Sequence, residues 1–537
     1  MTVHPSNPVS VTARPHAILS EPPRPPPPRP APFSPRSPPL PAIRVWNTLE
    51  RKKVDLQPIA VGKVGIYVCG LTVQNAPHLG HARSAVAFDV VRRHLTWRGY
   101  EVRLVRNITD VDDKIIAKAA EEGVPPAALA ERNVEALHRE MEALGVMPPD
   151  VEPRVTEHIP QIVALTERLI ASGHAYASGG DVYFAVLSFP EYGRLSGQSV
   201  DALKSGARVE RGEKQEKKKS PLDFALWKAA KKGEPSWPSP WGAGRPGWHI
   251  ECSAMALAHL SESFDVHGGG LDLVFPHHEN EIAQSQGALG GGTFARCWMH
   301  NGLLNVNDTK MSKSLGNFWL VSDVRKRYDP EAIRLYLLQP HYRAPVAFEV
   351  VEKDRRPSIP GVEEAEKRLD YFYSTLLRLD DFLGAKRVVD PGPVDPDSQR
   401  LLPSFTEAMD DDFNTPVAVA ELHEATKAAN RLLDEPKTVP KDVRRRSLAL
   451  LARDIRAAAT GSLGLLARDP GEFLRARRAR LAALRGIDVD EVVARLKARD
   501  DARKAKDFKA GDEIRRSLLA SGIEVMDTPR GADWRIV

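Results

Sequence analysis

Two apolar segments joined by a helical one constrain the fold more than any other feature of the sequence. Residues 64–68, Val-Gly-Ile-Tyr-Val, form a short apolar run suited to a strand buried on both faces of a parallel sheet. Apolar residues then recur with helical spacing from Val86 to Leu95, and residues 101–108 read as a second strand. A strand, a helix and a strand within about 45 residues match a right-handed crossover unit. The sequence therefore predicts an α/β fold built on a parallel sheet.

The strand pattern returns in the second half of the chain and then gives way to helices. Residues 263–266 and 294–299 are predicted strands. Residues 150–245 lie between the two α/β stretches as an insertion rich in Lys, Gly and Pro. Beyond about residue 320 the strand pattern fades, and segments rich in Ala, Leu and Arg predict helices from 360 to 520. Because open parallel sheets bind ligands at the carboxyl ends of their strands, we expect the functional residues there.

Composition narrows the classes of protein to which the chain can belong. Its 537 residues, 42% of them hydrophobic, are enough for several cores. No run of about 18 apolar residues is present, so the sequence predicts no transmembrane helix. Three cysteines, Cys69, Cys252 and Cys297, form no disulfide framework and favour a reduced, cytoplasmic setting. The net charge of +5 is a weak indication of a polyanionic partner.

Residues 1–43 differ in composition from the rest of the chain. They contain 15 of the 44 prolines and a single acidic residue, Glu21. Such a segment cannot bury a core and is predicted to sample polyproline II or disordered conformations. An organelle transit peptide would also be basic, but it should be amphipathic and rich in serine. We therefore expect a dispensable tail or a misassigned start rather than a targeting signal.

A His-Leu-Gly-His run at residues 78–81 follows the first strand and begins the helical segment. Backbone N–H groups and the positive dipole end of a helix N-terminus favour phosphate. His78 and His81 can donate hydrogen bonds to phosphate oxygens on which charge develops. Gly80, which lacks a Cβ, lets an adenine ring lie against the backbone. Nucleotidylyltransferases carry a similar run, and capping or packing histidines are the ordinary alternative, so this run alone leaves several interpretations open.

A second run, Lys-Met-Ser-Lys-Ser-Leu-Gly-Asn at residues 310–317, changes this balance. Lys310 and Lys313, three residues apart on a loop bounded by glycine, supply mobile positive charge for a leaving pyrophosphate. Their strongest contacts should form in the transition state, as differential binding requires. A solvated loop is the alternative interpretation of this run alone. In this order, the two runs predict an enzyme that activates a carboxylate with ATP.

With both runs the chain resembles the class I aminoacyl-tRNA synthetases, and the intervening sequence resembles the cysteinyl-tRNA synthetase family. The resemblance extends from about Ile43 to the C-terminus. Its most specific segments are Tyr-Val-Cys-Gly-Leu-Thr-Val at 67–73, Asn-Ile-Thr-Asp-Val-Asp-Asp-Lys at 107–114, Gly-Trp-His-Ile-Glu-Cys-Ser at 247–253 and Phe-Pro-His-His-Glu-Asn-Glu-Ile-Ala at 275–283. Departures are few: Leu79 replaces the commoner isoleucine, a volume-conserving change. Residues 370–490 agree only in outline, apart from Met-Asp-Asp-Asp-Phe-Asn-Thr-Pro at 409–416.

The resemblance implies a zinc site. The family's four zinc ligands correspond to Cys69, Cys252, His277 and Glu281, a mixture of thiolate, imidazole and carboxylate that suits one Zn²⁺ per chain. His277 and Glu281 are four residues apart, so a helix starting after Pro276 places both on one face. Because these four residues come from both halves of the sheet, their spacing along the sequence does not by itself identify them as metal ligands. For Cys252 by itself, a small buried hydrophobe is the alternative interpretation.

The resemblance also implies how L-cysteine is selected. The substrate thiol would bind the zinc as a thiolate, because a bound metal strongly favours deprotonation. A hydrophobic pocket discriminates such small differences only ~10–200-fold, so the zinc should make an editing domain unnecessary. Gly70, Thr109 and Trp248 are implied to line the amino-acid pocket, with a core or interface aromatic as the alternative for Trp248.

Other polar residues near these segments have open roles. His267 and Asp272 either help to hold the amino acid or the nucleotide, or belong to a structural turn. The three aspartates within residues 110–113 are expected to cap the following helix. Cys297 matches no ligand role and is interpreted as a buried thiol. The lysine-rich run at 214–219 is expected to be an exposed loop rather than a specific RNA contact.

The resemblance implies a Rossmann-like parallel-sheet catalytic domain with an inserted connective domain, then an all-α bundle and a small C-terminal anticodon-binding domain. The expected boundaries are 1–43 for the leader, 44–155 and 247–320 for the two halves of the catalytic domain, 156–246 for the insertion, 321–400 for a stem-contact region, 401–480 for a helical tRNA-binding bundle and 481–537 for the anticodon-binding domain. Basic residues gather in a helix-like part of the last domain, namely Arg503, Lys504, Lys506, Lys509, Arg515 and Arg516. Two short strands are expected to follow them.

The expected activity is a two-step ligation. ATP and L-cysteine form cysteinyl-adenylate with loss of pyrophosphate, and the cysteinyl group then passes to the 3′-terminal adenosine of tRNA(Cys). Mg²⁺ is expected to accompany ATP. We expect a monomer without membrane association, whose affinity for tRNA falls as salt rises.

Two rival functions are weighed against this one. A related ligase joins cysteine to an amino-sugar in mycothiol synthesis and shares the zinc site and both ATP runs, but it lacks the long tRNA-binding C-terminal part. A catalytically silent RNA-binding paralogue is disfavoured by intact His78, His81 and Lys313. A cut near residue 400 is predicted to spare adenylate formation and to prevent tRNA charging.

Overall fold

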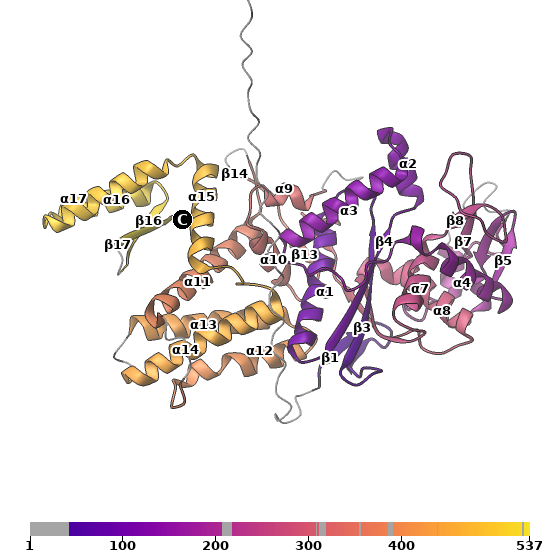
Figure 1. The fold of residues 1–537 in the computed structure, drawn as a ribbon, viewed down its shortest axis with the longest axis horizontal. Helices are drawn as coiled ribbons and strands as arrows, with labels where there is room; N and C mark the ends of the chain where they lie inside the picture. The colour runs from indigo at the N-terminus through magenta and orange to yellow at the C-terminus, as the bar shows by residue number, and fades with distance from the viewer. Residues whose placement is uncertain are drawn as a thin grey trace, which may run out of the picture.

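A four-stranded parallel sheet forms the centre of the molecule (Figure 1). The computed structural model describes residues 42–536 apart from 207–216, 308, 311–317, 354–355, 385–389, 436, 438 and 529–530. The strands are β3 (Lys63–Thr72), β4 (Glu101–Thr109), β9 (Phe264–Gly270) and β10 (Ala295–Asn301), in the order β10-β9-β3-β4. Helix α1 (Leu79–Trp97) connects β3 to β4 as the crossover. The predicted α/β class is confirmed.

Strand β3 lies at the point where the direction of the connections reverses. It pairs with β4 on one side and with β9 on the other, in parallel register with both. Helix α1 covers one face of the sheet, and α7 (Trp248–His259) and α8 (Glu279–Leu289) lie on the other side (Figure 1). Ligands of open α/β sheets bind outside the carboxyl ends of the strands at such a point.

Three of these strands run further than the sequence indicates. Cys69 lies inside β3, and β9 includes His267 and the three glycines after it. Neighbouring strands on both sides of Tyr67 supply hydrogen-bond partners, so polar and glycine residues stay extended beyond the apolar run. The register between β3 and β4 shifts between Val68 and Leu71. Such an irregularity re-aims side chains and is common next to active sites.

The connective insertion contains an antiparallel sheet that the sequence does not reveal. It is formed by β5 (Ala175–Ser178), β6 (Asp181–Phe184), β7 (Phe224–Ala229) and β8 (Gly244–Pro246), paired in chain order, with α4 (Ile159–Ala171) and α5 (Val200–Gly206). Its strands have three to six residues, too short for a clear alternating pattern. Residues 214–216 of the lysine-rich run lie outside the described residues. Lys217 bonds to Asp181 at 3.0 Å, and Lys219 lies over the Tyr176 ring.

Helices dominate after the sheet, as predicted. The elements before the bundle are β11 (Leu304–Val306), β12 (Thr309–Lys310), α9 (Val321–Arg325), α10 (Pro330–Leu338), β13 (Val346–Phe348), β14 (Val351–Lys353) and β15 (Arg356–Ser358). The bundle consists of α11 (Pro360–Leu383), α12 (Leu401–Asp410), α13 (Thr415–Asp434), α14 (Lys441–Ala458) and α15 (Pro470–Arg485). Short strands β1 (Arg44–Asn47) and β2 (Lys52–Asp55) and helices α2 (Asp113–Glu122) and α3 (Pro126–Ala143) complete the catalytic part. No helix within the described ranges is at once long and apolar enough to cross a bilayer.

The last part of the chain forms a separate small unit. It contains α16 (Val489–Lys504), α17 (Phe508–Ala520) and the antiparallel pair β16 (Ile523–Thr528) and β17 (Gly531–Ile536). The basic segment is therefore two helices rather than one, and the two expected strands are present. This unit and the connective insertion lie at opposite ends of the long axis (Figure 1). The domain boundaries given above stay predictions.

The helical bundle shares its core with the catalytic domain. One continuous cluster of buried apolar side chains runs from Ile43 through α1 and α10 to Phe473. Asp412, fully buried between α12 and α13, accepts hydrogen bonds from Trp46 N–H and the Tyr342 hydroxyl, both at 2.8 Å. A cut near residue 400 would expose this core, so the expectation that it spares adenylate formation is revised. The final unit has a core of its own around Trp534.

Candidate active site and metal centre

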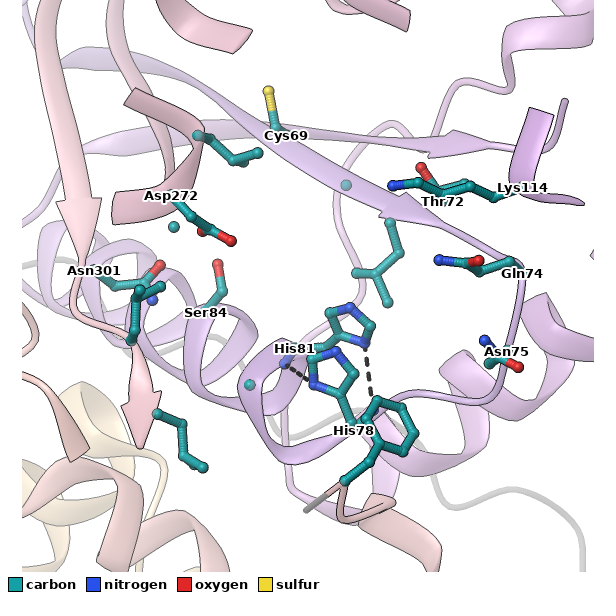
Figure 2. A pocket seen from close by; sticks show the side chains of 18 of the residues that line it. Cys69, Thr72, Gln74, Asn75, His78, His81, Ser84, Lys114, Asp272 and Asn301 are labelled. Carbon is teal, nitrogen blue, oxygen red and sulfur yellow. Dashed lines mark hydrogen bonds between the residues drawn. The ribbon is translucent and has the colours of Figure 1, made fainter. Parts of the chain in front are cut away.

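One cavity of about 340 Å³ opens at the carboxyl ends of β3, β9 and β10 (Figure 2). Its lining includes Cys69, Gly70, Gly270, Asn301, His78 and His81. The first two come from β3, the next two from the ends of β9 and β10, and the histidines from the start of α1. The structure thus brings candidate residues from both halves of the catalytic domain to the predicted edge of the sheet.

His78 and His81 cap the N-terminus of α1 reciprocally. His78 Nδ1 accepts the His81 backbone N–H at 3.3 Å, and His81 Nδ1 accepts the His78 backbone N–H at 3.3 Å. Their rings stack with centroids 3.5 Å apart. Ser, Thr, Asp or Asn usually fills the capping position, whereas here two imidazoles do so. Both rings lie beside the cavity in Figure 2. Gly80 also lines the cavity.

The second signature is described in part. Lys310 ends β12, which pairs with β11 at the side of the cavity. Residues 311–317, which include Lys313, lie outside the described residues. The described chain resumes at Phe318, which lines the cavity and meets the His78 ring edge-on with centroids 4.8 Å apart. The residue that directly follows the second run therefore lies next to the first run.

The four residues matched to zinc ligands lie together. Cys69 comes from β3, Cys252 from α7, and His277 and Glu281 from the start of α8 and the turn before it. One ligand atom of each lies within 4.8 Å of the others, and every one of the four residues is at most 9% exposed. His277 Nε2 lies 3.1 Å from Glu281 Oε1, so the predicted helical face is present. The helix starts slightly later than predicted, because residues 274–278 form a π-type turn.

Charges within this cluster are strongly coupled. Burial opposes ionisation of Cys252, but hydrogen bonding with Cys69 and the nearby His277 outweigh it and lower the thiol pKa to about 6. Burial also opposes protonation of His277, yet the Glu281 charge raises the pKa of His277 to about 10. Burial and the hydrogen bond with Cys252 raise the pKa of Cys69. A bound cation is what such a buried set of potential anions favours.

A second layer of histidines surrounds the cluster. His267 donates its Nε2–H to Glu281 Oε2 at 2.9 Å, and its ring stacks on Trp298 with centroids 4.4 Å apart. Nδ1 of His249 lies 2.9 Å from Nδ1 of His277. Partners of this kind orient metal ligands. The open role of His267 is thereby narrowed to holding Glu281, and this donor set fits a zinc ion.

The predicted amino-acid pocket is present in part. Gly70 and Trp248 line the cavity. A Cβ at Gly70 would lie 1.5 Å from the Asn107 carbonyl oxygen, so only glycine fits there. Trp248 stacks on His277 with centroids 4.4 Å apart. Thr109 is buried, donates its hydroxyl to Glu251 at 3.0 Å and does not line the cavity, so its pocket role stays a prediction.

The sequence analysis assigned no role in the site to several residues that line the cavity, namely Gln74, Asn75, Ser84 and Lys114. Asn301 follows a predicted strand, residues 294–299, and that position was the available signal for it. Its Nδ2 donates to the Gly302 carbonyl at 3.1 Å, while its buried Oδ1 has no partner within the described part of the chain. Asp272 and Asn301 lie on one side of the cavity, with Thr72 and Lys114 opposite (Figure 2).

Family profiles match most of the chain. The profile described as tRNA synthetases class I (C) catalytic domain matches residues 55–354. The DALR domain profile matches 404–467, and the profile described as cysteinyl-tRNA ligase anticodon binding domain matches 489–535. The last profile covers the separate unit formed by α16, α17, β16 and β17.

Curated relatives and solved structures agree with these profiles. A cysteine–tRNA ligase of Anaeromyxobacter sp. (strain Fw109-5) is 52% identical over 501 residues, which cover 92% of this chain and 99% of the relative. One of Pelobacter propionicus is 47% identical, covering 92% of this chain and all of the relative. The structure of Mycobacterium tuberculosis methionyl-tRNA synthetase in complex with methionyl-adenylate covers 80% of this chain and 96% of its own, with a TM-score of 0.56 and 16% identity, and shows the shared fold. The chain belongs to the cysteine–tRNA ligases, a family of class I aminoacyl-tRNA synthetases.

Proposed function

We propose that the chain activates L-cysteine with ATP to cysteinyl-adenylate and transfers the cysteinyl group to tRNA(Cys). The observation that carries the proposal is a single cavity whose lining combines Cys69, Gly70 and Trp248 with His78 and His81. An amino acid held at the metal end then lies beside ATP held at the helix end. Attack of its carboxylate on the α-phosphate becomes effectively intramolecular, which is a large source of rate enhancement.

The metal end is proposed to hold one zinc ion per chain through Cys69, Cys252, His277 and Glu281. When bound, zinc would take the substrate sulfur as a thiolate, which serine and alanine cannot match. The protein's own contribution is to hold these donor atoms together and to exclude water from them. His267 contributes by bonding to the second Glu281 oxygen, which fixes the orientation of the carboxylate.

The nucleotide end is proposed to stabilise charge on the phosphates. His78 and His81 at the N-terminus of α1 donate hydrogen bonds to the α-phosphate, where the helix dipole also favours negative charge. Lys310 and Lys313 neutralise the departing pyrophosphate, and Mg²⁺ accompanies ATP. The backbone after the lysine loop supports this placement, because Leu79 N–H donates to the Trp319 carbonyl at 3.0 Å.

Transfer is proposed to begin at the 2′-hydroxyl of the terminal adenosine. The hydroxyl oxygen attacks the carbonyl carbon of the adenylate and gives its proton to a phosphate oxygen. The bond between the carbonyl carbon and the phosphate oxygen breaks, and AMP leaves with the electron pair. The C-terminal unit and its basic residues are proposed to grip tRNA(Cys), with an affinity that falls as salt rises. We propose a cytoplasmic monomer.

Two assays test this function. Exchange of pyrophosphate into ATP should depend on cysteine, since the reverse of adenylate formation needs the amino acid. Purified tRNA(Cys) should then be charged, whereas the amino-sugar acceptor of the mycothiol-type ligase should not. Absence of cysteine-dependent exchange would favour the silent paralogue, and cysteine transfer to the amino-sugar alone would favour the related ligase.

A further inference from the structure

Strand β3 is irregular at the point where it enters the active site. Its pairing with β4 is regular up to Val68 and resumes at Leu71. Cys69 and Gly70, which lie between, together face the single residue Asn107 of β4. Two residues against one match a β-bulge, which bends the strand and changes where its side chains point. This bulge contains a residue matched to a zinc ligand, Cys69, and a residue of the cavity lining, Gly70.

The side chain of Asn107 bonds to this bulge. Its Oδ1 accepts the Gly70 backbone N–H at 2.8 Å. A backbone N–H can only donate, so this contact fixes which end of the amide faces β3. Asn107 is 1% exposed, and bulk water therefore cannot take over the role of this oxygen.

The same amide also contacts the other strand-distant thiol of the metal cluster. Cys252 Sγ lies 3.6 Å from Asn107 Oδ1. Asn107 Nδ2 donates to Thr109 Oγ1 at 3.4 Å. The Thr109 hydroxyl donates in turn to Glu251, which precedes Cys252 in α7. Asn107 thus lies between β3 and α7, the two elements that supply the thiols, and a shift of its side chain would move them relative to each other.

Asn107 is placed behind the reacting groups rather than among them. It does not line the reaction cavity, whereas Gly70 does. It is also not one of the four residues matched to zinc ligands. Its influence on the site must therefore pass through the bulge and the thiols that it contacts. Partners that hold metal ligands from behind typically change metal affinity by ~10–100-fold when they are substituted.

We propose that Asn107 is a positioning residue for the metal end of the reaction cavity. The inference rests on the proposed function and deepens it by naming what sets the geometry of the cysteine pocket. The amide oxygen holds the bulge so that Cys69 Sγ reaches the metal cluster while Gly70 borders the cavity. One side chain therefore sets zinc affinity and the fit of the amino acid together. The nucleotide end is built on α1 and should not depend on it.

Replacing the amide by an apolar group of similar size tests this proposal. Asn107→Leu removes the acceptor of the Gly70 N–H. Zinc affinity, measured by release to a competing chelator, should fall about 10–100-fold. The KM for cysteine in pyrophosphate exchange should rise about 10-fold or more, because the metal that binds the thiol and the cavity wall move together. The KM for ATP should stay at its wild-type value.

Asn133→Leu is the matched control. Asn133 is also buried, at 4% exposure, and its Nδ2 donates at 2.9 Å to the carbonyl of Val73, which directly follows β3. The control therefore also removes a hydrogen bond between a buried amide and the backbone. Asn133 lies on α3, outside the cavity lining and the metal cluster. Thermal stability should fall in this variant, while zinc affinity and the KM for cysteine should not change.

Each outcome decides for or against the role of Asn107. If Asn107→Leu does not fold, Asn107→Ser replaces it, because the serine hydroxyl is too short to reach Gly70 and its small size admits water. Unchanged zinc affinity and KM for cysteine in the folded variant would overturn the proposal, as would an equal rise of the KM for ATP. Equal losses in Asn133→Leu would overturn it by revealing a general effect of stability. A wild-type enzyme without cysteine-dependent exchange would refute the proposed function instead, and zinc release would still measure the role of Asn107.

Discussion

The two ends of the reaction cavity are built in opposite ways. The metal end gathers Cys69, Cys252, His277 and Glu281 from distant parts of the chain into a buried cluster. The nucleotide end consists of neighbouring residues at one helix terminus, with Phe318 beside them. The group that selects the amino acid is thus held by the core, whereas the groups that act on phosphate depend on local turns. Each end should therefore fail separately when its own residues are changed.

The largest effect is expected at the metal end. Cys69→Ser should remove a zinc ligand and lower kcat/KM for cysteine in pyrophosphate exchange by about 10³-fold or more. This loss exceeds the ~10–100-fold that is typical when a residue hydrogen-bonded to a metal ligand is changed. Zinc content of the purified protein should fall with it. Cys297→Ala, which alters a buried thiol outside the cavity, is the control. Near-normal zinc content and cysteine affinity in Cys69→Ser would refute the metal assignment.

At the nucleotide end, a substitution should lower activity without lowering the zinc content. His81→Ala removes a donor to the α-phosphate and should lower kcat of pyrophosphate exchange by about 10²–10³-fold. Zinc content should stay at the wild-type level, because His81 touches no metal ligand among the contacts described above. Metal analysis beside exchange kinetics checks both statements. A loss of zinc in this variant would show that the two ends are not independent.

A third test removes a region remote from both ends. Ending the chain at Ile487 deletes α16, α17, β16 and β17, whose core is distinct from that of the bundle and includes only Ala482 from α15. Pyrophosphate exchange should persist, because the core shared by the catalytic domain and the bundle stays intact. Charging of tRNA(Cys) should fall about 100-fold through lost RNA contacts. Ending the chain near residue 400 is the comparison, and it should abolish exchange as well.

A smaller effect is expected behind the metal ligands. His267→Asn removes the hydrogen bond to Glu281 Oε2 and should weaken zinc affinity about 10-fold. Zinc release to a competing chelator measures this directly. The KM for ATP should not change, since His267 does not line the cavity. A raised KM for ATP with unchanged zinc affinity would assign His267 to the nucleotide instead.

The same contrast explains what could be predicted from the sequence. The run at 78–81 is contiguous, so its place at a helix N-terminus follows from local spacing. The metal ligands are non-local, and only family resemblance connected Cys69 with Cys252. The partnership of His267 with Glu281 depends on a strand that extends past its apolar run, which local pattern does not show. The insertion sheet was missed because its strands are short, and the shared core around Asp412 because buried contacts across domains leave no periodic signal.

The reciprocal cap of residues 78–81 also decides which nitrogen of each ring carries hydrogen. Both Nδ1 atoms accept a backbone N–H, so in a neutral ring the proton sits on Nε2. Each imidazole is held in one tautomer and keeps an Nε2–H even without positive charge. A doubly protonated ring, by contrast, would have to break the cap. Phosphate binding by these two residues should therefore survive into mildly alkaline solution, where ordinary histidine cations have disappeared.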